Sequence, residues 1–259
     1  MILKIRHLAI DFGARRVVDI ETLDLRTGEI LGLAGESGSG KTMTALAIMG
    51  LTATSGARVV GGSVTLDGRE LLHLRSKDLR RIRGSQIAMI FQTPVSAFNP
   101  LFKVGYIFTR ALRLHGASRS EARTRARVAL AEVRLPFDML ERYPFELSGG
   151  QAQRLAIALA VALRSQVLLA DEPTSALDVS VQGEILDLIR RLRDHEDMAV
   201  LFVSHDLAVV AELCDQVAVM RKGRIVEFGA ATQVLHSPTD DYTRQLVDSV
   251  PRLSALREG

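Results

Sequence analysis

The sequence predicts an α/β fold: a core built on a mostly parallel sheet, an antiparallel β-layer beside it, and an inserted helical subdomain. Three observations predict this fold. Short β-branched or aliphatic runs alternate with segments of helical period, which is the pattern of βαβ units. Two runs, Val167–Ala170 and Ala199–Val203, are apolar throughout, as strands buried on both faces of a parallel sheet require. The middle of the chain, from about residue 93 to 163, lacks convincing strands.

The expected elements follow from these periods. We expect strands at Ile2–Ile5, Val17–Leu25, Ile30–Ala34, Ile87–Phe91, Val167–Ala170, Val200–Val203 and Val217–Met220. We expect helices at Met43–Met49, Ala122–Val133, Ala152–Leu163, Val181–Leu192 and Leu207–Leu213. The early strands differ from the later ones, since Val17–Leu25 alternates apolar with acidic residues and Val64–Leu66 precedes the turn pair Asp67-Gly68. These features predict the antiparallel layer.

The middle of the chain contains an expected helix that begins with a recognisable N-terminal cap. Ser118 and Glu121 have capping-box spacing, and apolar residues follow at helical intervals. We therefore expect one domain over residues 1–259. Its core comprises residues 1–92 and 164–259, and its helical subdomain covers about 93–163.

Composition narrows the function classes. The 259 residues are 47% hydrophobic. The chain has 33 basic and 30 acidic residues, and the resulting net charge of +3 is too small to predict nucleic-acid binding. The one dense basic stretch, residues 79–83, is interpreted as solvated surface. Cys214 is the single cysteine, which excludes an intrachain disulfide or a Cys-rich metal site and suits a reducing compartment. The longest apolar run, Leu155–Leu163, is shorter than the about 20 residues of a membrane span, so a membrane role would need a partner.

A phosphate-binding loop is the first chemical motif. Residues 35–42 fit G-x-x-x-x-G-K-[ST] between an expected strand and an expected helix, which indicates a P-loop NTPase (RecA-like) core. Its glycines let backbone N–H groups approach phosphate, and the helix adds its positive end. A chance Gly/Ser loop is the alternative. The motif alone indicates nucleotide binding, and the expected binding residues are Gly35, Glu36, Ser37, Gly38, Ser39, Gly40, Lys41, for the β- and γ-phosphates, and Thr42, whose hydroxyl would bind Mg²⁺.

Two carboxylates end the strand Val167–Ala170. Asp171 stands where a Mg²⁺ shell needs negative charge, and Glu172 where a general base could activate water. The alternative is a strand that simply ends in a polar turn.

Leu147-Ser148-Gly149-Gly150-Gln151 precedes this strand and opens the helical run Ala152–Leu163. A Ser-Gly-Gly turn at a helix N-terminus is a second anion-binding device, or merely a helix cap. With this motif the sequence resembles the ATP-binding cassette (ABC) family over essentially its whole length. The resemblance implies that Ser148, Gly149, Gly150 and Gln151 bind the γ-phosphate of ATP held by an opposite subunit.

The resemblance also implies roles for single positions. Gln92 resembles the glutamine that touches Mg²⁺ and senses the permease, and His205 the switch histidine on the γ-phosphate. Ser175-Ala176-Leu177-Asp178 resembles the D-loop that links the two sites. Phe12 stands where the family has an aromatic that stacks on adenine, although a buried Phe beside a strand is the alternative.

Several stretches resemble the peptide and nickel importer branch, among them Asn99-Pro100-Leu101, Tyr143-Pro144-Phe145-Glu146-Leu147 and Tyr242-Thr243-Arg244. The resemblance implies an ATPase at the cytoplasmic face of the membrane, paired with a second, different ABC ATPase, two permeases and, indirectly, a solute-binding protein. The short tail of this chain and Ser96-Ala97-Phe98-Asn99-Pro100 resemble the shorter ATPase subunit of the nickel importer, which favours nickel or a metal chelate over dipeptides. The alternatives are a soluble ABC ATPase of DNA repair or translation and a catalytically silent cassette, which the intact Lys41, Asp171, Glu172 and His205 oppose.

Overall fold

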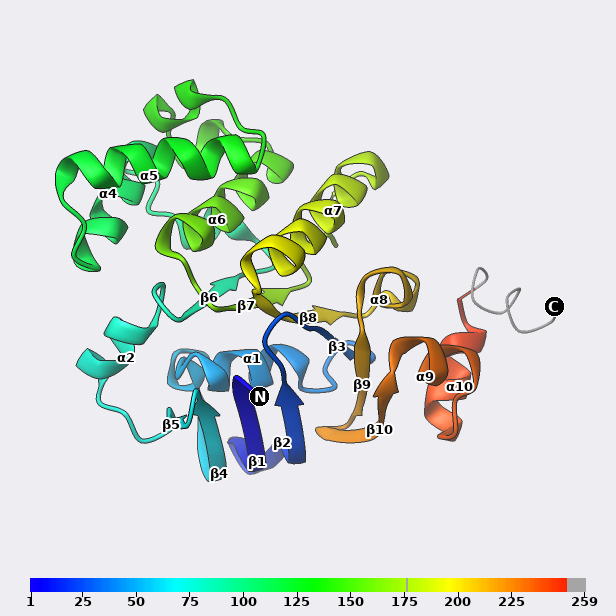
Figure 1. The fold of residues 1–259 in the computed structure, drawn as a ribbon. Helices are drawn as coiled ribbons and strands as arrows, with labels where there is room; N and C mark the ends of the chain where they lie inside the picture. Colours follow the sequence, from blue (N-terminus) through cyan, green and yellow to red (C-terminus); the bar gives the residue numbers. More distant parts are fainter. Residues whose placement is uncertain (176, 251–259) are drawn as a thin grey trace.

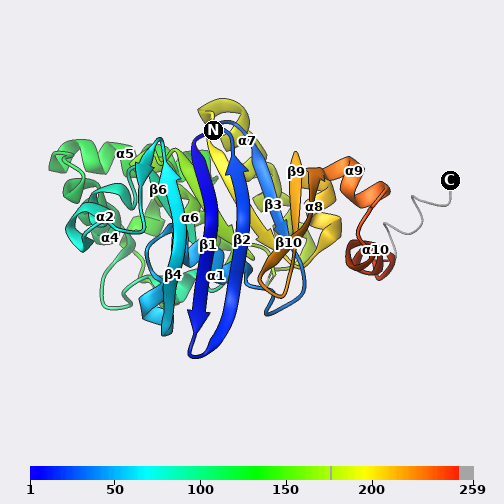
Figure 2. The ribbon, with the colours of Figure 1, turned by 90° about the horizontal axis from the view of Figure 1, so that it is seen from below.

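The fold is seen in a computed structural model that describes residues 1–175 and 177–250. Two sheets form its framework (Figure 1). The first has four strands in the order β2-β1-β4-β5, with bounds Arg15–Leu25, Leu3–Phe12, Ala57–Leu66 and Arg69–Glu70, and every pairing is antiparallel. Asp67 and Gly68 both have positive φ in the β4–β5 turn, as the turn prediction requires. Figure 2 shows β4, β1 and β2 side by side on one face of the molecule.

The second sheet has six strands in the order β10-β9-β3-β8-β7-β6. Five of them run parallel: β9 (Gln216–Arg221), β3 (Ile30–Ala34), β8 (Ala199–Ser204), β7 (Val167–Asp171) and β6 (Ile87–Ile90). The edge strand β10 (Arg224–Ala230) is antiparallel to β9. The prediction of a mostly parallel core with an antiparallel layer is confirmed.

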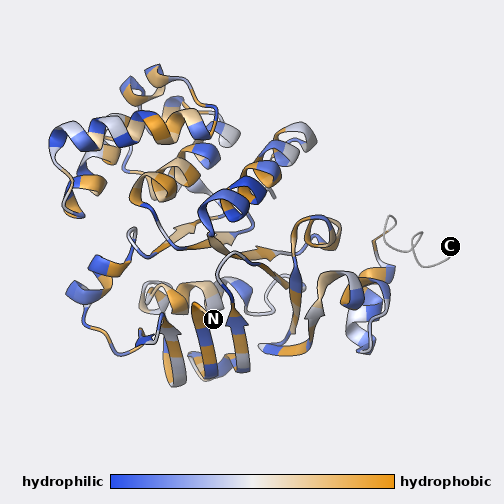
Figure 3. Ribbon diagram, in the orientation of Figure 1, coloured by the Kyte–Doolittle hydropathy of each residue, from blue (hydrophilic) through white to orange (hydrophobic). Residues whose placement is uncertain are grey.

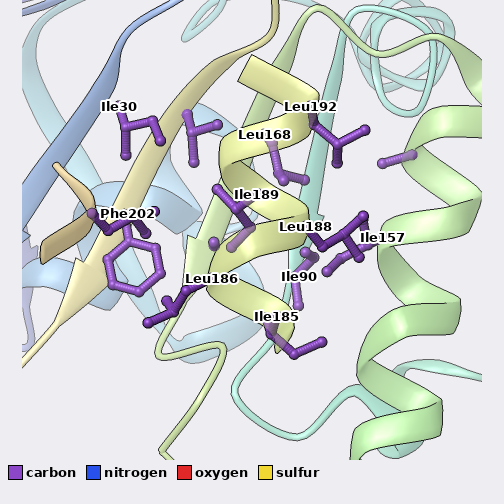
Figure 4. Close-up of a cluster of buried hydrophobic side chains, with 14 of the residues drawn as sticks. Ile30, Ile90, Ile157, Leu168, Ile185, Leu186, Leu188, Ile189, Leu192 and Phe202 are labelled. Carbon is purple, nitrogen blue, oxygen red and sulfur yellow. The ribbon is translucent and has the colours of Figure 1, made fainter. Parts of the chain in front are cut away.

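Alternate residues of the parallel strands feed two apolar cores. In β8, Val200 and Phe202 join one core, whereas Leu201 and Val203 join the other. The second core lies between the two sheets and contains α1 (Lys41–Ile48). The first core packs under α6 (Gly149–Leu163), α7 (Val179–Glu196) and α8 (Leu207–Leu213). Figure 4 shows Ile185, Leu188 and Ile189 of α7 among the buried side chains, with Leu188 beside Ile157 of α6. Both faces of the parallel sheet are therefore buried, as the unbroken apolar runs predict.

Residues 94–163 contain helices and no strand in the structure (Figure 1). They form α3 (Pro94–Ala97), α4 (Val104–Leu114), α5 (Arg119–Glu132) and α6, with two 3-10 turns at Phe137–Glu141 and Pro144–Glu146. Ser118 and Glu121 make both bonds of the predicted capping box at the start of α5. The remaining elements are a 3-10 turn at Thr52–Ser55, α2 (Ser76–Ile82), α9 (Ala231–His236) and α10 (Asp241–Asp248).

The basic stretch at residues 79–83 is only partly solvated surface. Arg80 and Arg81 are exposed, but Leu79 and Ile82 are buried on the inner side of α2. Arg83 donates hydrogen bonds to the carbonyl oxygens of Met49 and Gly50. The stretch is therefore the amphipathic end of a helix, and one of its arginines has a structural role.

Hydropathy is distributed as in a protein with an internal core: Figure 3 shows apolar and polar residues interleaved on the helices around the sheet. In the part of the chain that the structure describes, every helix is too short or too polar to cross a bilayer.

The tight packing of β3 against α8 yields a stability prediction. A Cβ added to Gly32 would lie 2.9 Å from Val210 Cγ1 and 3.0 Å from Cys214 Sγ, whereas one added to Gly61 in β4 would meet nothing closer than 3.8 Å. Overpacking a core typically costs about 1–3 kcal/mol. We therefore expect Gly32→Ala to lower the free energy of unfolding by about that amount in urea titrations, and Gly61→Ala to change it by less than about 0.5 kcal/mol. Equal effects of the two substitutions would contradict this account of the β3–α8 contact.

Candidate functional site

The site begins with the loop between β3 and α1. Gly35, Gly38 and Gly40 have φ values of 145°, 78° and 109°, which favour glycine. A Cβ on Gly35 would lie 2.2 Å from Met220 O, and one on Gly40 would lie 2.7 Å from Val17 O. Two of the motif's glycines are thus required by close backbone packing as well as by backbone angle. Gly223 N also donates to Ser39 O at 2.8 Å, which ties the loop to the β9–β10 turn.

Lys41 opens α1 and is 5% exposed. Its Nζ donates to Gly35 O at 2.7 Å and to Glu36 O at 2.9 Å, so the ammonium group lies against the inside of the loop. Burial lowers the pKa of Lys41, and the carboxylates of Glu172 and Asp171 oppose that lowering. The acidic strand end therefore helps to keep the lysine charged.

Thr42 and Asp171 meet across the site. Thr42 Oγ1 donates to Asp171 Oδ1 at 2.9 Å, and Asp171 is 4% exposed at the end of β7. Burial raises the pKa of Asp171, against the hydrogen bond from Thr42. A hydroxyl and a carboxylate are hard oxygen ligands that suit Mg²⁺, which takes one or two carboxylates and completes its shell with waters and phosphate oxygens. Among the described residues there is no cluster of three or more His, Cys, Asp and Glu side chains that could hold a metal alone.

Glu172 follows directly and brings together the three residues predicted to be catalytic. Its Oε2 accepts from Gln92 Nε2 at 2.8 Å, and its Oε1 lies 2.9 Å from His205 Nδ1. Glu172 has a backbone φ of 47°, which is uncommon for residues other than Gly, Asn or Asp. Its N–H donates to Val203 O at 2.9 Å. This backbone turn directs the carboxylate to the ends of the neighbouring strands β6 and β8.

Lys41 and Thr42 line a cleft of about 740 Å³, within the range of roughly 300–1,000 Å³ typical of ligand sites, whereas Asp171 lies behind Thr42 and outside the lining. Its wall contains most of the phosphate loop together with Gln92, Glu172 and His205. Ser39 Oγ in the loop is buried and has no hydrogen-bond partner. Ser39 does not line the cleft, but the loop residues that do, with the ammonium group of Lys41 and the hydroxyl of Thr42, offer donors that fit a ligand with acceptor oxygens, as phosphate has.

Other predicted residues lie outside the cleft's lining. Phe12 is 54% exposed at the end of β1, and Asp178 is exposed at the N-cap of α7. Ser148 is the N-cap of α6 and forms a capping box with Gln151. Its N–H donates to Gln151 Oε1 at 3.0 Å, and its Oγ accepts from Gln151 N at 3.3 Å. A Cβ on Gly150 would lie 2.6 Å from Val181 Cγ1. Ala176 of the predicted D-loop lies outside the described residues.

Sequence reasoning missed several residues of the cleft. Val17, Met43, Leu207 and Leu246 line it. The hydroxyl of Tyr242 accepts from Glu36 N at 3.2 Å, although 206 positions separate the two residues. The tail containing Tyr242 and Leu246 has no motif of known chemistry, so only the three-dimensional fold reveals this contact.

Comparison with known proteins finds a matching family and several similar ATP-binding proteins. The ABC transporter family matches residues 18–175. The glutathione import ATP-binding protein GsiA of Salmonella typhimurium is 47% identical over 244 residues, which cover 91% of this chain and 39% of that protein. The oligopeptide transport ATP-binding protein OppD of the same species is 42% identical over 262 residues, covering 98% of this chain and 78% of that protein. The chain thus spans about two-fifths of the length of the glutathione import relatives it matches.

Two solved structures are similar in fold. The dimeric ATP-binding cassette MJ0796, in a post-hydrolysis state with ADP and Pi, has a TM-score of 0.78 at 27% identity, over 88% of this chain and 98% of that one. CbiO1 of Clostridium perfringens, part of the ABC transporter complex CbiONQ, has a TM-score of 0.79 at 24% identity, over 100% and 99% of the two chains, and shows likeness of fold alone. The glycine-rich loop, the acidic strand end and these similarities agree, and the chain belongs to the ABC transporter family.

Proposed function

We propose that this chain is the ATP-hydrolysing subunit of an ABC importer. The observation that carries the proposal is the position of Glu172, whose carboxylate contacts Gln92 and His205 in the same cleft as the phosphate loop. A general base must lie within hydrogen-bond reach of the water that it deprotonates. Glu172 would accept that proton, His205 would contact the γ-phosphate, and Lys41 with the loop N–H groups would hold the triphosphate.

Thr42, Asp171 and Gln92 are the residues that we propose hold Mg²⁺. When bound, Mg²⁺ would neutralise charge on the phosphate oxygens. Thr42 lines the cleft and is hydrogen-bonded to Asp171, so the carboxylate lies directly behind that part of the wall. We propose that the ring of Phe12 stacks on adenine, for which its 54% exposure leaves a free face.

The residues Ser148–Gln151 suit a nucleotide on a partner subunit. Ser148 and Gly149 are exposed at the N-terminus of the 15-residue helix α6, and none of residues 148–151 lines the cleft of its own chain. A helix N-terminus favours an anion. We propose that ATP is bound between the loop of one cassette and Ser148–Gln151 of another, with Asp178 at the contact of the two sites. The dimeric state of MJ0796 supports this arrangement.

An apolar groove of about 400 Å³ supports a permease partner. It lies among β6, α4 and α6, and its lining includes Phe91, Phe98, Phe102 and Leu159. Phe91 faces this groove while its neighbour Gln92 lines the nucleotide cleft. Adjacent residues thus connect the two surfaces. We propose that permease segments dock here, at the cytoplasmic face of the membrane, and that a different ABC ATPase completes the pair.

The relatives favour one cargo class. GsiA and OppD are named for glutathione and oligopeptides, so we propose a peptide-class cargo, and nickel or a metal chelate stays a prediction of the sequence. A solute-binding protein would deliver that cargo. The soluble DNA-repair or translation ATPase is disfavoured by relatives that are named as import and transport proteins.

The chemical proposal is tested with Glu172→Gln, which keeps the shape of the side chain and removes the base. Loss of a general base costs about 10²–10⁴ in rate, so turnover should fall by that factor in proteoliposomes that contain the permease partners, while Mg-ATP binding persists. The exposed Glu132→Gln on α5 serves as the control and should hydrolyse ATP at the native rate. Hydrolysis by Glu172→Gln within threefold of native would reject Glu172 as the base.

The binding proposal is tested with Lys41→Ala. A charge-assisted hydrogen bond contributes about 1.5–3 kcal/mol, so the Kd for Mg-ATP should rise by about ten- to hundredfold. Calorimetry measures this change, and the exposed Lys77→Ala on α2 should leave the Kd unchanged. If Lys41→Ala binds Mg-ATP as tightly as native protein, the lysine does not hold the phosphates.

The assembly proposal is tested with Ser148→Arg in the Glu172→Gln background. We expect sedimentation to show no ATP-driven association, alone or with the partner ATPase, while ATP still binds the monomer. The substitution also removes a helix cap, which typically contributes about 0.5–2 kcal/mol. Ser118→Arg removes the equivalent cap of α5 and should leave association intact. Normal dimerisation of Ser148→Arg in every pairing would exclude the shared site.

A further inference from the structure

The C-terminal helix α10 contacts the phosphate loop through one hydroxyl. Tyr242 is 4% exposed, and its hydroxyl accepts from Glu36 N at 3.2 Å. Leu246, one turn further along α10, lines the nucleotide cleft. Residues four apart share a helix face. One face of α10 is therefore directed at the nucleotide site from the side opposite the acidic strand end.

The peptide that Tyr242 contacts is the one that holds Lys41. Glu36 O accepts from Lys41 Nζ at 2.9 Å and from Ser39 N at 3.2 Å, and Gly35 O accepts from Lys41 Nζ at 2.7 Å. The hydroxyl thus holds the N–H of Glu36, while the carbonyl oxygen of the same residue orients Lys41.

Several contacts hold Tyr242 in place. Glu227 in β10 accepts hydrogen bonds from Thr239 and from Asp240 N, just before α10. Asp240 then caps the helix by accepting from Tyr242 N at 2.8 Å. The guanidinium of Arg221 lies 4.6 Å from the centre of the Tyr242 ring. The tyrosine therefore has a firm support on the core sheet, which is a requirement for positioning another group.

Packing alone does not explain a tyrosine here. Phenylalanine would fill the same space and keep the contact with Arg221, without the cost of burying a hydroxyl. The hydroxyl's acceptor lone pair is used by Glu36 N–H, a donor outside the regular hydrogen bonding of β3 and α1. Each of the two groups supplies the partner that the other lacks.

We propose that Tyr242 is a positioning residue for the phosphate loop, acting through the N–H of Glu36 on the peptide that orients Lys41. The proposal rests on the proposed function, since it assumes that the loop binds the triphosphate.

The first test is Tyr242→Phe. Loss of one neutral hydrogen bond should raise the Kd for Mg-ATP by about two- to tenfold, and KM should rise while kcat stays within about twofold. Tyr106→Phe, an exposed tyrosine on α4, is the control and should leave the Kd unchanged. An unchanged Kd for Tyr242→Phe overturns the proposal.

The second test removes the donor instead of the acceptor. Glu36→Pro deletes the N–H that Tyr242 accepts from. In that background Tyr242→Phe should have no further effect on the Kd. If Tyr242→Phe raises the Kd equally in both backgrounds, the hydroxyl acts elsewhere and the proposal is overturned.

The third test needs neither nucleotide nor Glu36→Pro. Amide hydrogen exchange of residues 35–39 should be faster in Tyr242→Phe than in native protein, while exchange in Ala199–Ser204 of β8 stays the same. Equal exchange of residues 35–39 in the two proteins overturns the proposal. If exchange differs between the two proteins in this way but the native protein binds no Mg-ATP, the proposed function is refuted. The contact between α10 and the loop would then still be established.

Discussion

The geometry of a parallel sheet is the constraint on which the site depends. Strands β3, β8, β7 and β6 are neighbours and run in one direction, so their carboxyl ends meet at one edge. The phosphate loop follows β3, Gln92 follows β6, Glu172 follows β7 and His205 follows β8. Four segments far apart in the chain thereby place the predicted site residues in one cleft. The two apolar cores, one on each face of the sheet, stabilise that arrangement because every strand contributes alternate side chains to both.

This constraint explains why so much of the fold and site could be predicted from the sequence. A fully apolar strand followed directly by a polar motif is recognisable from adjacent residues alone. The sequence around residues 167–172 was therefore enough to predict β7 with Asp171 and Glu172 at its carboxyl end. The edge strand β10 and helix α4 were missed for physical reasons. β10 is partly exposed, with no regular alternation of burial, and α4 contains Gly105 and several β-branched and aromatic residues that weaken the helical signal. The contact from Tyr242 to Glu36 has no local signal at all, because it arises from how α10 packs against β10.

Local stability and function share residues in this chain. Ser148 completes a capping box in its own subunit, and the same exposed N-terminus of α6 is the surface proposed to meet a partner's nucleotide. Gly35 and Gly40 are needed for close backbone packing and also form the concave loop. A motif can therefore satisfy a structural explanation and a functional one together, and finding the cap does not exclude the ligand. Substitutions that remove both roles need a control that removes only the structural one.

The charges of the cleft show what its ligand must supply. Burial raises the pKa of Asp171 and lowers that of Lys41, so each ionised group is less favourable in the folded protein than in water. For a carboxyl whose folded pKa is raised, the penalty on folding is absent below its unfolded pKa and grows as the pH rises above it. A cation beside Asp171 and phosphate beside Lys41 would each offset that penalty, and a ligand that binds only the folded state stabilises it. The same burial that makes the site costly to fold would make the proposed electrostatic contacts to Mg-ATP stronger than they would be in open water.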